Sequence, residues 1–368
     1  MDDTLYKVAF ASIRGMGIEL AQRMLDVIPS ENEFFTMPEK EIKAITGGRS
    51  RIYDSSYRNQ QLDKAKRELE FINNKNIGLL YYTQPNYPTR LLEACDAPLL
   101  LYTSGNCNLN SAHVVSIVGT RHATNYGIRM CQEIVQQLSE RLDDLIVVSG
   151  LAYGIDIAAH RAAVKNNVPT VAIMARGLNK IYPASHRNDA VDIVRHGGMI
   201  ATDYQSQDEI HKGNFLARNR IIAGLADCTV VVESASSGGA LVTASLASSY
   251  NRDVYAVPGR VGDEFSRGCN KLIHNNQAMS ITCADDIIEA MRWTPKTSPA
   301  QQMELFPTLT AEEQKIVDLL QQEGDLHINI IASHTGMPIY RIMASLVELD
   351  CKGIVISLPG SRYTLHRK

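Results

Sequence analysis

The chain has 368 residues, too many for one compact core, so two or three domains are expected. Its 45% hydrophobic residues are typical of a globular protein, no apolar run approaches the roughly 18–20 residues of a membrane span, and the N-terminus does not resemble a secretory signal, which predicts a cytoplasmic protein. The formal net charge of −3 gives the whole chain no signature of nucleic-acid binding, so a binder of this composition must gather its basic residues on one surface.

The seven cysteines lie singly, without a C-x-x-C pair or a paired histidine motif. This spacing argues against a zinc site and a disulfide framework, and it favours reduced, buried thiols. We therefore predict no metal.

Residues 1–75 are expected to form a helical domain of the SAM or helix-hairpin-helix kind. Apolar residues at helical spacing predict helices at 13–28 and 38–47, and a long polar helix follows at 55–74. The Gly15-Met16-Gly17 turn resembles a helix-hairpin-helix turn, which can bind DNA phosphates through backbone N–H groups. We favour an ordinary turn between helices.

Residues 76–293 are expected to form an α/β domain. After a transition at 76–113, short β-branched runs bounded by glycine alternate with helical segments, among them 126–141, 154–166 and 185–196. Such runs suit strands that are buried on both faces, and the helices between them imply a parallel sheet. Because crossovers are right-handed, we predict a Rossmann-like, doubly wound, mostly parallel sheet.

Residues 294–308 are rich in Pro, Gln and Thr and are expected to be a linker. Residues 309–368 are expected to form a winged-helix domain. Thr310 and Glu313 form a capping box for a helix at 311–322, two further helices follow, and a hairpin turns at Pro359-Gly360.

The loop Gly119-Thr120-Arg121 follows the first strand of the predicted parallel series, and sheets of this class bind ligands at the carboxyl ends of their strands. It lacks the G-x-G-x-x-G pattern, so no dinucleotide cofactor is expected. The glycine permits close backbone approach, the following helix N-terminus favours anions, and Arg121 can donate two hydrogen bonds to a phosphate. A structural ion pair is the alternative for Arg121.

The loop 150–156 leads into a helix that carries Asp156 and His160 four residues apart, on one helix face. A catalytic pair is conceivable there, but we expect a structural contact between the two side chains, because no nucleophile lies nearby in the sequence.

The segment 211–220 holds Lys212, Arg218 and Arg220 with no acid, and a single aromatic residue, Phe215. Cations beside an exposed ring are what single-stranded nucleic acid requires, because cations bind phosphates and a ring stacks on a base. In the alternative, Phe215 packs into the core and the arginines pair with nearby acids, which are Asp203, Asp208 and Glu209.

Gly238 and Gly239 lie between a strand that ends at Glu233 and the next helix. Two glycines allow a phosphate or a neighbouring chain to approach a helix N-terminus. Tight packing of that helix on the sheet explains the glycines equally well.

Together these segments resemble the DNA-processing protein A (Smf) family. The matching stretches occur in the family's order over about 160 residues, and they are SIVGTR at 116–121, SGLAYGIDIAAH at 149–160, NFLARNRIIAGLAD at 214–227, SGGALVTASLA at 237–247, YAVPG at 255–259 and GCNKLI at 268–273. Segment 87–105 and the three-part layout agree with the family. Thr120 replaces the usual Ser, and Leu216 replaces the commoner Pro.

The resemblance implies a homodimer that coats single-stranded DNA, protects incoming strands during natural transformation and passes them to the RecA recombinase. It implies a phosphate contact at Arg121 and base stacking at Phe215, with Arg218 and Arg220 in the basic groove or its framework. The full predicted DNA-binding set is Gly119, Arg121, Arg187, Lys212, Asn214, Phe215, Arg218, Arg220, Gly238 and Gly239. The predicted dimer surface contains Asn270, Leu272 and Ile273.

Two other functions are weighed. Nucleotide phosphoribohydrolases carry a catalytic glutamate shortly after paired glycines, whereas no carboxylate follows Gly239 before Asp253, so we expect no enzyme. A duplex-DNA regulator would read bases through the winged helix, but its candidate recognition helix offers only Arg341 and Lys352 as cations.

Overall fold

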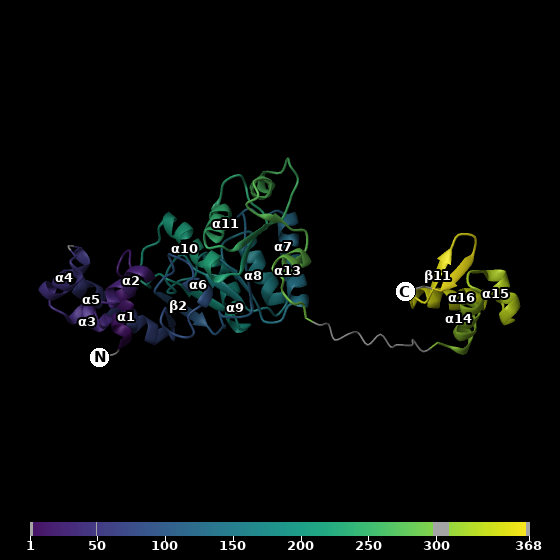
Figure 1. Ribbon diagram of the computed structural model, residues 1–368, viewed down its shortest axis with the longest axis horizontal. Helices are drawn as coiled ribbons and strands as arrows, with labels where there is room; N and C mark the ends of the chain where they lie inside the picture. The colour runs from purple at the N-terminus through teal and green to yellow at the C-terminus, as the bar shows by residue number, and fades with distance from the viewer. Residues whose placement is uncertain (1–2, 49, 297–308, 366–368) are drawn as a thin grey trace. The chain divides into compact units, whose positions relative to one another are not determined.

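The structure, a computed structural model, describes residues 3–48, 50–296 and 309–365. The chain divides into two compact units, residues 1–296 and 297–368, and each is described by itself (Figure 1). The predicted linker at 294–308 begins within the first unit, where Lys296 pairs with Asp143 at 3.2 Å. Its residues 297–308 lie outside the described residues.

The first unit begins with a group of helices. These are α1 (Asp3–Ala11), α2 (Ile18–Leu25), α3 (Glu31–Thr36), α4 (Glu39–Thr46), the 3₁₀ turn η1 (Arg51–Tyr53) and α5 (Ser55–Lys75). The helix predicted at 13–28 is shorter, because Gly15 has a φ of +81° and the chain turns before Ile18. Helix α5 packs on the sheet that follows, where buried Glu68 accepts a hydrogen bond from the backbone N–H of Ser206 at 2.9 Å. The helical region and the sheet therefore share one hydrophobic core.

The sheet has the strand order β1-β2-β6-β5-β4-β3-β7-β8-β9. Its strands are β1 (Gly78–Tyr81), β2 (Leu100–Gly105), β3 (His113–Val118), β4 (Leu145–Ser149), β5 (Thr170–Ile173), β6 (Met199–Thr202), β7 (Cys228–Val231), β8 (Asp253–Ala256) and β9 (Met279–Ser280). From β6 to β9 every neighbouring pair is parallel, whereas β2 is antiparallel to both β1 and β6. The predicted mostly parallel, doubly wound sheet is confirmed, with an antiparallel extension at one edge.

Helices cover both faces of this sheet (Figure 1). They are α6 (Thr89–Leu92), α7 (Asn125–Arg141), α8 (Ile155–Lys165), η2 (Ala184–His186), α9 (Arg187–Arg195), α10 (Lys212–Leu225), α11 (Gly239–Ser249), η3 (Glu264–Ser266), α12 (Arg267–His274) and α13 (Ala284–Ala290). Successive residues of a strand point to opposite faces, so Val115 and Ile117 of β3 pack with α7, α8 and α13, while Val114 and Val118 pack with α10 and α11. A two-sided core of this kind explains the continuous apolar strands of the sequence.

The second unit is a winged helix. It consists of α14 (Ala311–Glu323), β10 (Leu326–His327), α15 (Ile328–Thr335), α16 (Ile339–Cys351), β11 (Val355–Leu358) and β12 (Arg362–Leu365), with the sheet order β10-β12-β11. The predicted capping box is present, because Glu313 N–H donates to the Thr310 hydroxyl at 3.2 Å and Thr310 N–H donates to the Glu313 carboxylate at 2.7 Å.

The cysteines depart in part from the expected buried thiols. Cys131, Cys228 and Cys269 are buried, whereas Cys95 is exposed.

No helix of the described residues combines the length and the apolar character that crossing a bilayer requires.

Candidate functional site

A cleft of about 560 Å³ opens at the carboxyl ends of β3 and β7. From β3 the chain continues through α7 to β4, and from β7 it continues through α11 to β8 on the opposite side, so the strand order reverses between these two neighbours. The loop after β3 and the loop after β7 therefore lead away in opposite directions, and doubly wound sheets bind ligands in the gap between two such loops. The loop after β3, helix α10 and the start of α11 line the cleft.

The loop after β3 is held by backbone contacts on both sides. Thr120 N–H donates to the Glu233 carbonyl at 2.7 Å, and Ile155 N–H donates to the Thr120 carbonyl at 3.2 Å. A Cβ on Gly119 would lie 2.4 Å from Ile155, and one on Gly154, which has a φ of +78°, would lie 2.1 Å from the Thr120 carbonyl. Gly119 therefore serves the packing of the loop, and Arg121, two residues further on, lines the cleft.

Three side chains from separate elements meet in the cleft. Phe215 of α10 is half-buried, and the Arg121 guanidinium carbon lies 5.3 Å from the centre of its ring. The ring of Tyr182 lies 5.4 Å from that of Phe215, and Tyr182 is 45% exposed. Phe215 thus lines the cleft and does not plug the core. The arrangement offers a cation beside an accessible ring, and the two interact favourably.

Arg218 is a buried part of the framework of the cleft. It is 4% exposed, and its guanidinium donates to the carbonyls of Gly150, at 2.7 Å, and of Ile173. Burial raises the pKa of Asp156, and the positive charge of Arg218 opposes that rise. The same burial lowers the pKa of Arg218, and the nearby charge of Arg121 lowers it further. Two cations beside one acid leave this part of the cleft with an excess of positive charge.

Arg220 points away from the cleft. Its guanidinium pairs with Asp203 and donates to the Asp96 carbonyl. Of the two roles considered for Arg220 from the sequence, the structure therefore has the ion pair with Asp203. Arg220 also lies outside the cleft lining. Arg218 and Arg220 are two positions apart on α10 and therefore project to different sides of the helix.

The expected contact between Asp156 and His160 is wrong. The His160 Nδ1 atom lies 2.7 Å from the Thr170 hydroxyl of β5, while Asp156 faces Arg218. Burial lowers the pKa of His160 to about 3, so its imidazole is neutral. Side chains four residues apart on a helix can meet, but here each has its partner on a different element.

The remaining predicted DNA-binding residues are distributed unevenly. Lys212, at the start of α10, is exposed and lines the cleft, as do Gly238 and Gly239 at the start of α11. The Asn214 amide donates to the Glu209 carbonyl at 3.2 Å and lies outside the cleft lining. Arg187, the first residue of α9, is exposed but also lies outside that lining.

The predicted dimer residues lie on α12. The Asn270 side chain accepts from Gly259 N–H at 3.1 Å and donates to the Gly259 carbonyl at 2.9 Å, which fixes the loop after β8. Leu272 is buried in the core of its own unit, and Ile273 packs partly against that core. Leu272 is therefore a core residue of the monomer, and Ile273 is the more accessible of the two.

Sequence reasoning missed several residues of the cleft. Tyr182, after β5, lines the cleft, and Tyr153, after β4, lines a smaller neighbouring pocket that shares Arg121 and Phe215 with it; both tyrosines are exposed. His122, next to Arg121, is exposed and lines the cleft as well. An aromatic or imidazole ring in a loop that directly follows a strand of a parallel sheet would have been the signal, because all such loops gather at one edge.

The cleft is suited to an anion joined to a flat ring. Arg121 and Lys212 supply exposed positive charge, and Phe215 and Tyr182 supply ring faces. Among the described residues that line the cleft, Asp156 is the sole acid, and it is buried beside Arg218. The Glu233 carboxylate accepts from Thr124 N–H at 2.9 Å and is directed at the start of α7. A general acid or base must reach the reacting atom, and neither carboxylate is free to do so.

The fold and the cleft define a Rossmann-like α/β protein with a basic and aromatic site at its switch point and a winged helix in the same chain. Residues 78–292 match the family model of DNA recombination-mediator protein A, and residues 298–361 match that of the DprA winged helix domain. Protein Smf of Synechocystis is 30% identical over 97% of this chain and 98% of its own length.

Two solved structures are similar to this chain. DNA processing protein A of Streptococcus pneumoniae is 28% identical with a TM-score of 0.65, over 78% of this chain and 98% of that one. DNA processing protein A of Helicobacter pylori, whose structure concerns its single-stranded DNA binding mode, is 27% identical with a TM-score of 0.52, over 59% of this chain and 95% of that one. The chain belongs to the DNA recombination-mediator protein A family, in agreement with the resemblance of its motifs.

Proposed function

We propose that the cleft binds single-stranded DNA without regard to sequence. One observation carries the proposal: the half-buried ring of Phe215 lies next to both the exposed cation of Arg121 and the ring of Tyr182. A base stacks on the ring, the guanidinium binds the adjoining phosphate, and Lys212 adds a second phosphate contact. Every base has an aromatic face and every nucleotide has a phosphate, so such a site does not depend on sequence.

Single strands suit this site better than duplex. The rings can stack only on a base that is not already stacked in a helix. The winged helix supports a duplex reader poorly, because Arg341 of α16 pairs with Glu312 at 2.9 Å and Lys352 pairs with Glu313. Both cations of that segment are therefore engaged within their own unit. A match to the Helicobacter pylori protein, whose structure concerns single-stranded DNA, supports the same choice.

On this proposal the protein works in the cytoplasm as a homodimer that has no enzymatic activity. It covers and protects incoming single strands during natural transformation and hands them to the RecA recombinase. The membership in the DNA recombination-mediator protein A family supports this role.

A salt titration with a fluorescently labelled poly-dT oligonucleotide tests the proposal. Phe215→Ala removes one stacking face and should weaken binding by about 5- to 150-fold, which corresponds to roughly 1–3 kcal/mol per stacked base. Arg121→Ala should weaken binding to all sequences alike and lower the slope of log K against log salt by about one. Fluorescence anisotropy between about 50 and 200 mM salt measures both effects.

A control variant and two further assays accompany this titration. Arg141→Ala removes an exposed arginine in the last turn of α7, outside the cleft lining, and should leave the affinity close to that of the wild type. Wild-type affinity in both cleft variants would overturn the site. Tighter binding of duplex than of single strand would favour a duplex regulator, and hydrolysis of nucleoside monophosphates by the purified protein would favour an enzyme.

A further inference from the structure

His122 follows Arg121 in the loop after β3, and its ring lies nearly parallel to another aromatic ring, that of Phe265. The centres of the His122 and Phe265 rings are 6.2 Å apart, and the ring planes are inclined by only 28°. His122 is exposed and lines the cleft, whereas Phe265 is half-buried and lies outside the cleft lining. The imidazole is therefore the accessible ring of the pair.

Both rings are fixed to the ends of the two central strands. His122 N–H donates to the Thr120 hydroxyl at 3.2 Å, so the hydroxyl side chain of the Gly-Thr-Arg loop shapes the backbone that carries the imidazole. Phe265 lies in η3, and its carbonyl accepts from Ser234 N–H at 2.7 Å, directly after β7. These two hydrogen bonds position the backbone segments from which the two rings project.

We propose that His122, supported by Phe265, is a second base-stacking platform that takes the nucleotide next to the one on Phe215. The proposal rests on the proposed function of the cleft. The α-carbons of Arg121 and His122 are about 3.8 Å apart, yet the Arg121 side chain lies on Phe215 and the His122 side chain lies on Phe265. Two neighbouring residues of one loop thus pair with two different rings, so a phosphate at Arg121 would have two ring platforms within reach, as a dinucleotide unit requires.

The loop around Phe265 has no excess of positive charge, which favours base stacking over phosphate binding at this platform. The loop around Phe265 carries Asp263 and Glu264 together with Arg260 and Arg267, so its charges cancel. The positive charge of the cleft comes from Arg121, Arg218 and Lys212, and none of these belongs to the loop around Phe265. On this proposal two successive bases occupy the two rings, and Arg121 binds the phosphate between them.

A cycle of two changes, one in the protein and one in the DNA, tests the inference. The full-length protein binds either a labelled dT oligonucleotide or an abasic oligonucleotide of equal length and equal phosphate count. His122→Ala should weaken binding of dT by about 5- to 150-fold, the range of one stacked base, and should change binding of the abasic strand by less than about twofold. Equal losses on both strands would mean that His122 contacts the backbone, and would overturn the platform.

Further variants separate the effect of a ring from that of a charge. His122→Tyr keeps a flat ring and should stay within a few-fold of wild type on dT, whereas His122→Lys supplies a cation without a ring and should lose the preference for dT over the abasic strand. His196→Ala, an exposed histidine of the same unit outside the cleft lining, serves as the control and should have no effect. Wild-type affinity of His122→Ala on dT, with Phe215→Ala impaired, would overturn this inference alone. Wild-type protein that fails to bind dT would instead overturn the proposed function.

Discussion

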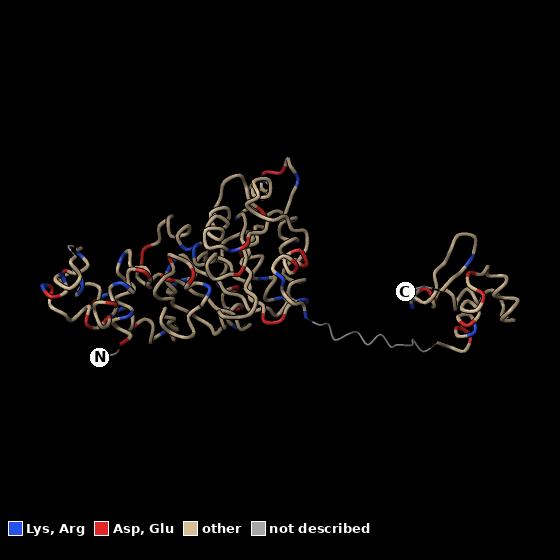
Figure 2. The backbone as a smooth tube through the Cα atoms, in the orientation of Figure 1, with Lys and Arg blue, Asp and Glu red and all other residues tan. Residues whose placement is uncertain are grey.

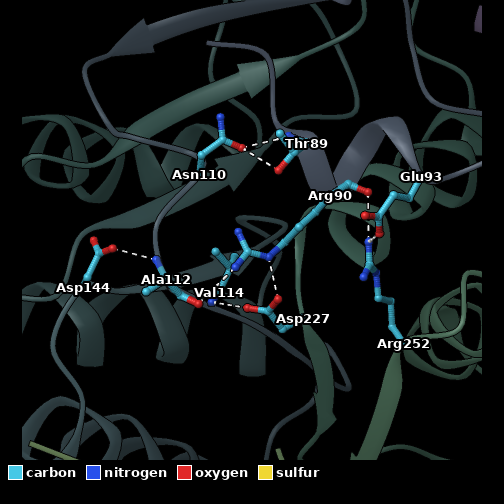
Figure 3. A network of polar contacts seen from close by, with 9 residues as sticks. All are labelled: Thr89, Arg90, Glu93, Asn110, Ala112, Val114, Asp144, Asp227 and Arg252. Atoms are coloured by element: carbon cyan, nitrogen blue, oxygen red, sulfur yellow. Dashed lines mark hydrogen bonds and ion pairs between the residues drawn. The ribbon is translucent and has the colours of Figure 1, made fainter. Parts of the chain in front are cut away.

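Strands β3 and β7 have charged residues at both of their ends, but the two ends use them differently. At the amino ends the Asp227 carboxylate accepts from Arg90 at 2.6 Å and from Val114 N–H at 2.8 Å (Figure 3). Arg252 pairs with Glu93 at 2.6 Å in the same network. At the carboxyl ends, among the residues that the structure describes, Arg121 and Lys212 form no ion pair.

This difference separates stability from binding. A cation whose partner is already present holds the fold together, whereas a cation left open to solvent keeps its charge for a ligand. Lys and Arg are interspersed with Asp and Glu through both units (Figure 2), so the whole-chain charge conceals the contrast. The basic character of the cleft arises because local acids are few and not because cations are many.

The largest effect on stability is expected at the amino ends of β3 and β7, where the charged side chains are paired. Asp227→Ala should lower the free energy of unfolding by about 3 kcal/mol, because it leaves the Arg90 guanidinium, whose side chain is 15% exposed, and the Val114 N–H without their acceptor. Urea denaturation measures the loss. The folded variant should bind dT as the wild type does.

Glu93→Ala is the matched control for this change. Glu93 also pairs with an arginine of the network, but its side chain is 64% exposed, so the loss should stay below about 1 kcal/mol. A stable Asp227→Ala variant with weakened DNA binding would contradict the division between the two ends.

Two arginines near α10 give the next largest contrast. Arg220→Ala should lower the free energy of unfolding by about 2 kcal/mol, because it leaves the Asp203 carboxylate, whose side chain is only 15% exposed, without its cation. Its dT affinity and salt slope should match the wild type, since Arg220 faces away from the cleft. Arg121→Ala should do the opposite, with unchanged unfolding and a reduced salt slope. A reduced salt slope in Arg220→Ala would show instead that Arg220 contacts the DNA.

Much of the first unit's sheet was predictable from the sequence. The strands from β3 to β8 are apolar, β-branched runs buried on both faces, and their periodicity is local. Strand β1 was missed because Gly78–Tyr81 is short and pairs with a distant segment, Leu100–Thr103. Helices α1 and α3 were missed because they are short and are stabilised by packing such as the contact of Phe10 with Phe34 at 5.2 Å.

The site was predictable in its types of residue but not in their roles. Arg218 and Arg220 occur in one motif and look alike in the sequence. Their roles depend on partners far along the chain, the Gly150 carbonyl in one case and Asp203 in the other. The same holds for His122 and Tyr182, which reach the cleft from loops separated by about sixty residues. Sequence spacing alone does not encode such contacts.

Lowering the pH should have a smaller effect on stability, through Asp144, which lies near the amino ends of the strands. Hydrogen bonds from Ala112 N–H and the Ser111 hydroxyl lower the pKa of Asp144 below its ordinary value. A lowered pKa in the folded state means that this stabilisation is complete above the ordinary Asp value of about 4 and is lost as the pH falls below it. Asp144 is exposed, so the effect should be at most about 1 kcal/mol.

Thermal unfolding of the wild type and of Asp144→Asn between pH 3 and 7 measures this loss. The wild type should be the more stable protein near neutral pH, and the difference should vanish toward the acid end of that range. A difference that stays constant with pH would show that the charge of Asp144 contributes nothing.

The smallest effect on stability is expected at Gly238. The same residue tests whether DNA binds at the carboxyl ends of β3 and β7. This residue precedes α11 with an extended φ of 166°, and the nearest atom to an added Cβ would be the Ser234 hydroxyl at 3.7 Å. Gly238→Ala should therefore change the free energy of unfolding by less than about 0.5 kcal/mol. It should still weaken dT binding several-fold if the DNA backbone lies against the start of α11, since the methyl group would occupy that space.

Gly17→Ala is the control, because Gly17 precedes α2 as Gly238 precedes α11. No atom lies within 4 Å of a Cβ added to Gly17, and this residue is outside the cleft lining. If Gly17→Ala weakened binding and Gly238→Ala did not, the DNA would run over the N-terminal turn, and the open ends of β3 and β7 would lose their assigned role.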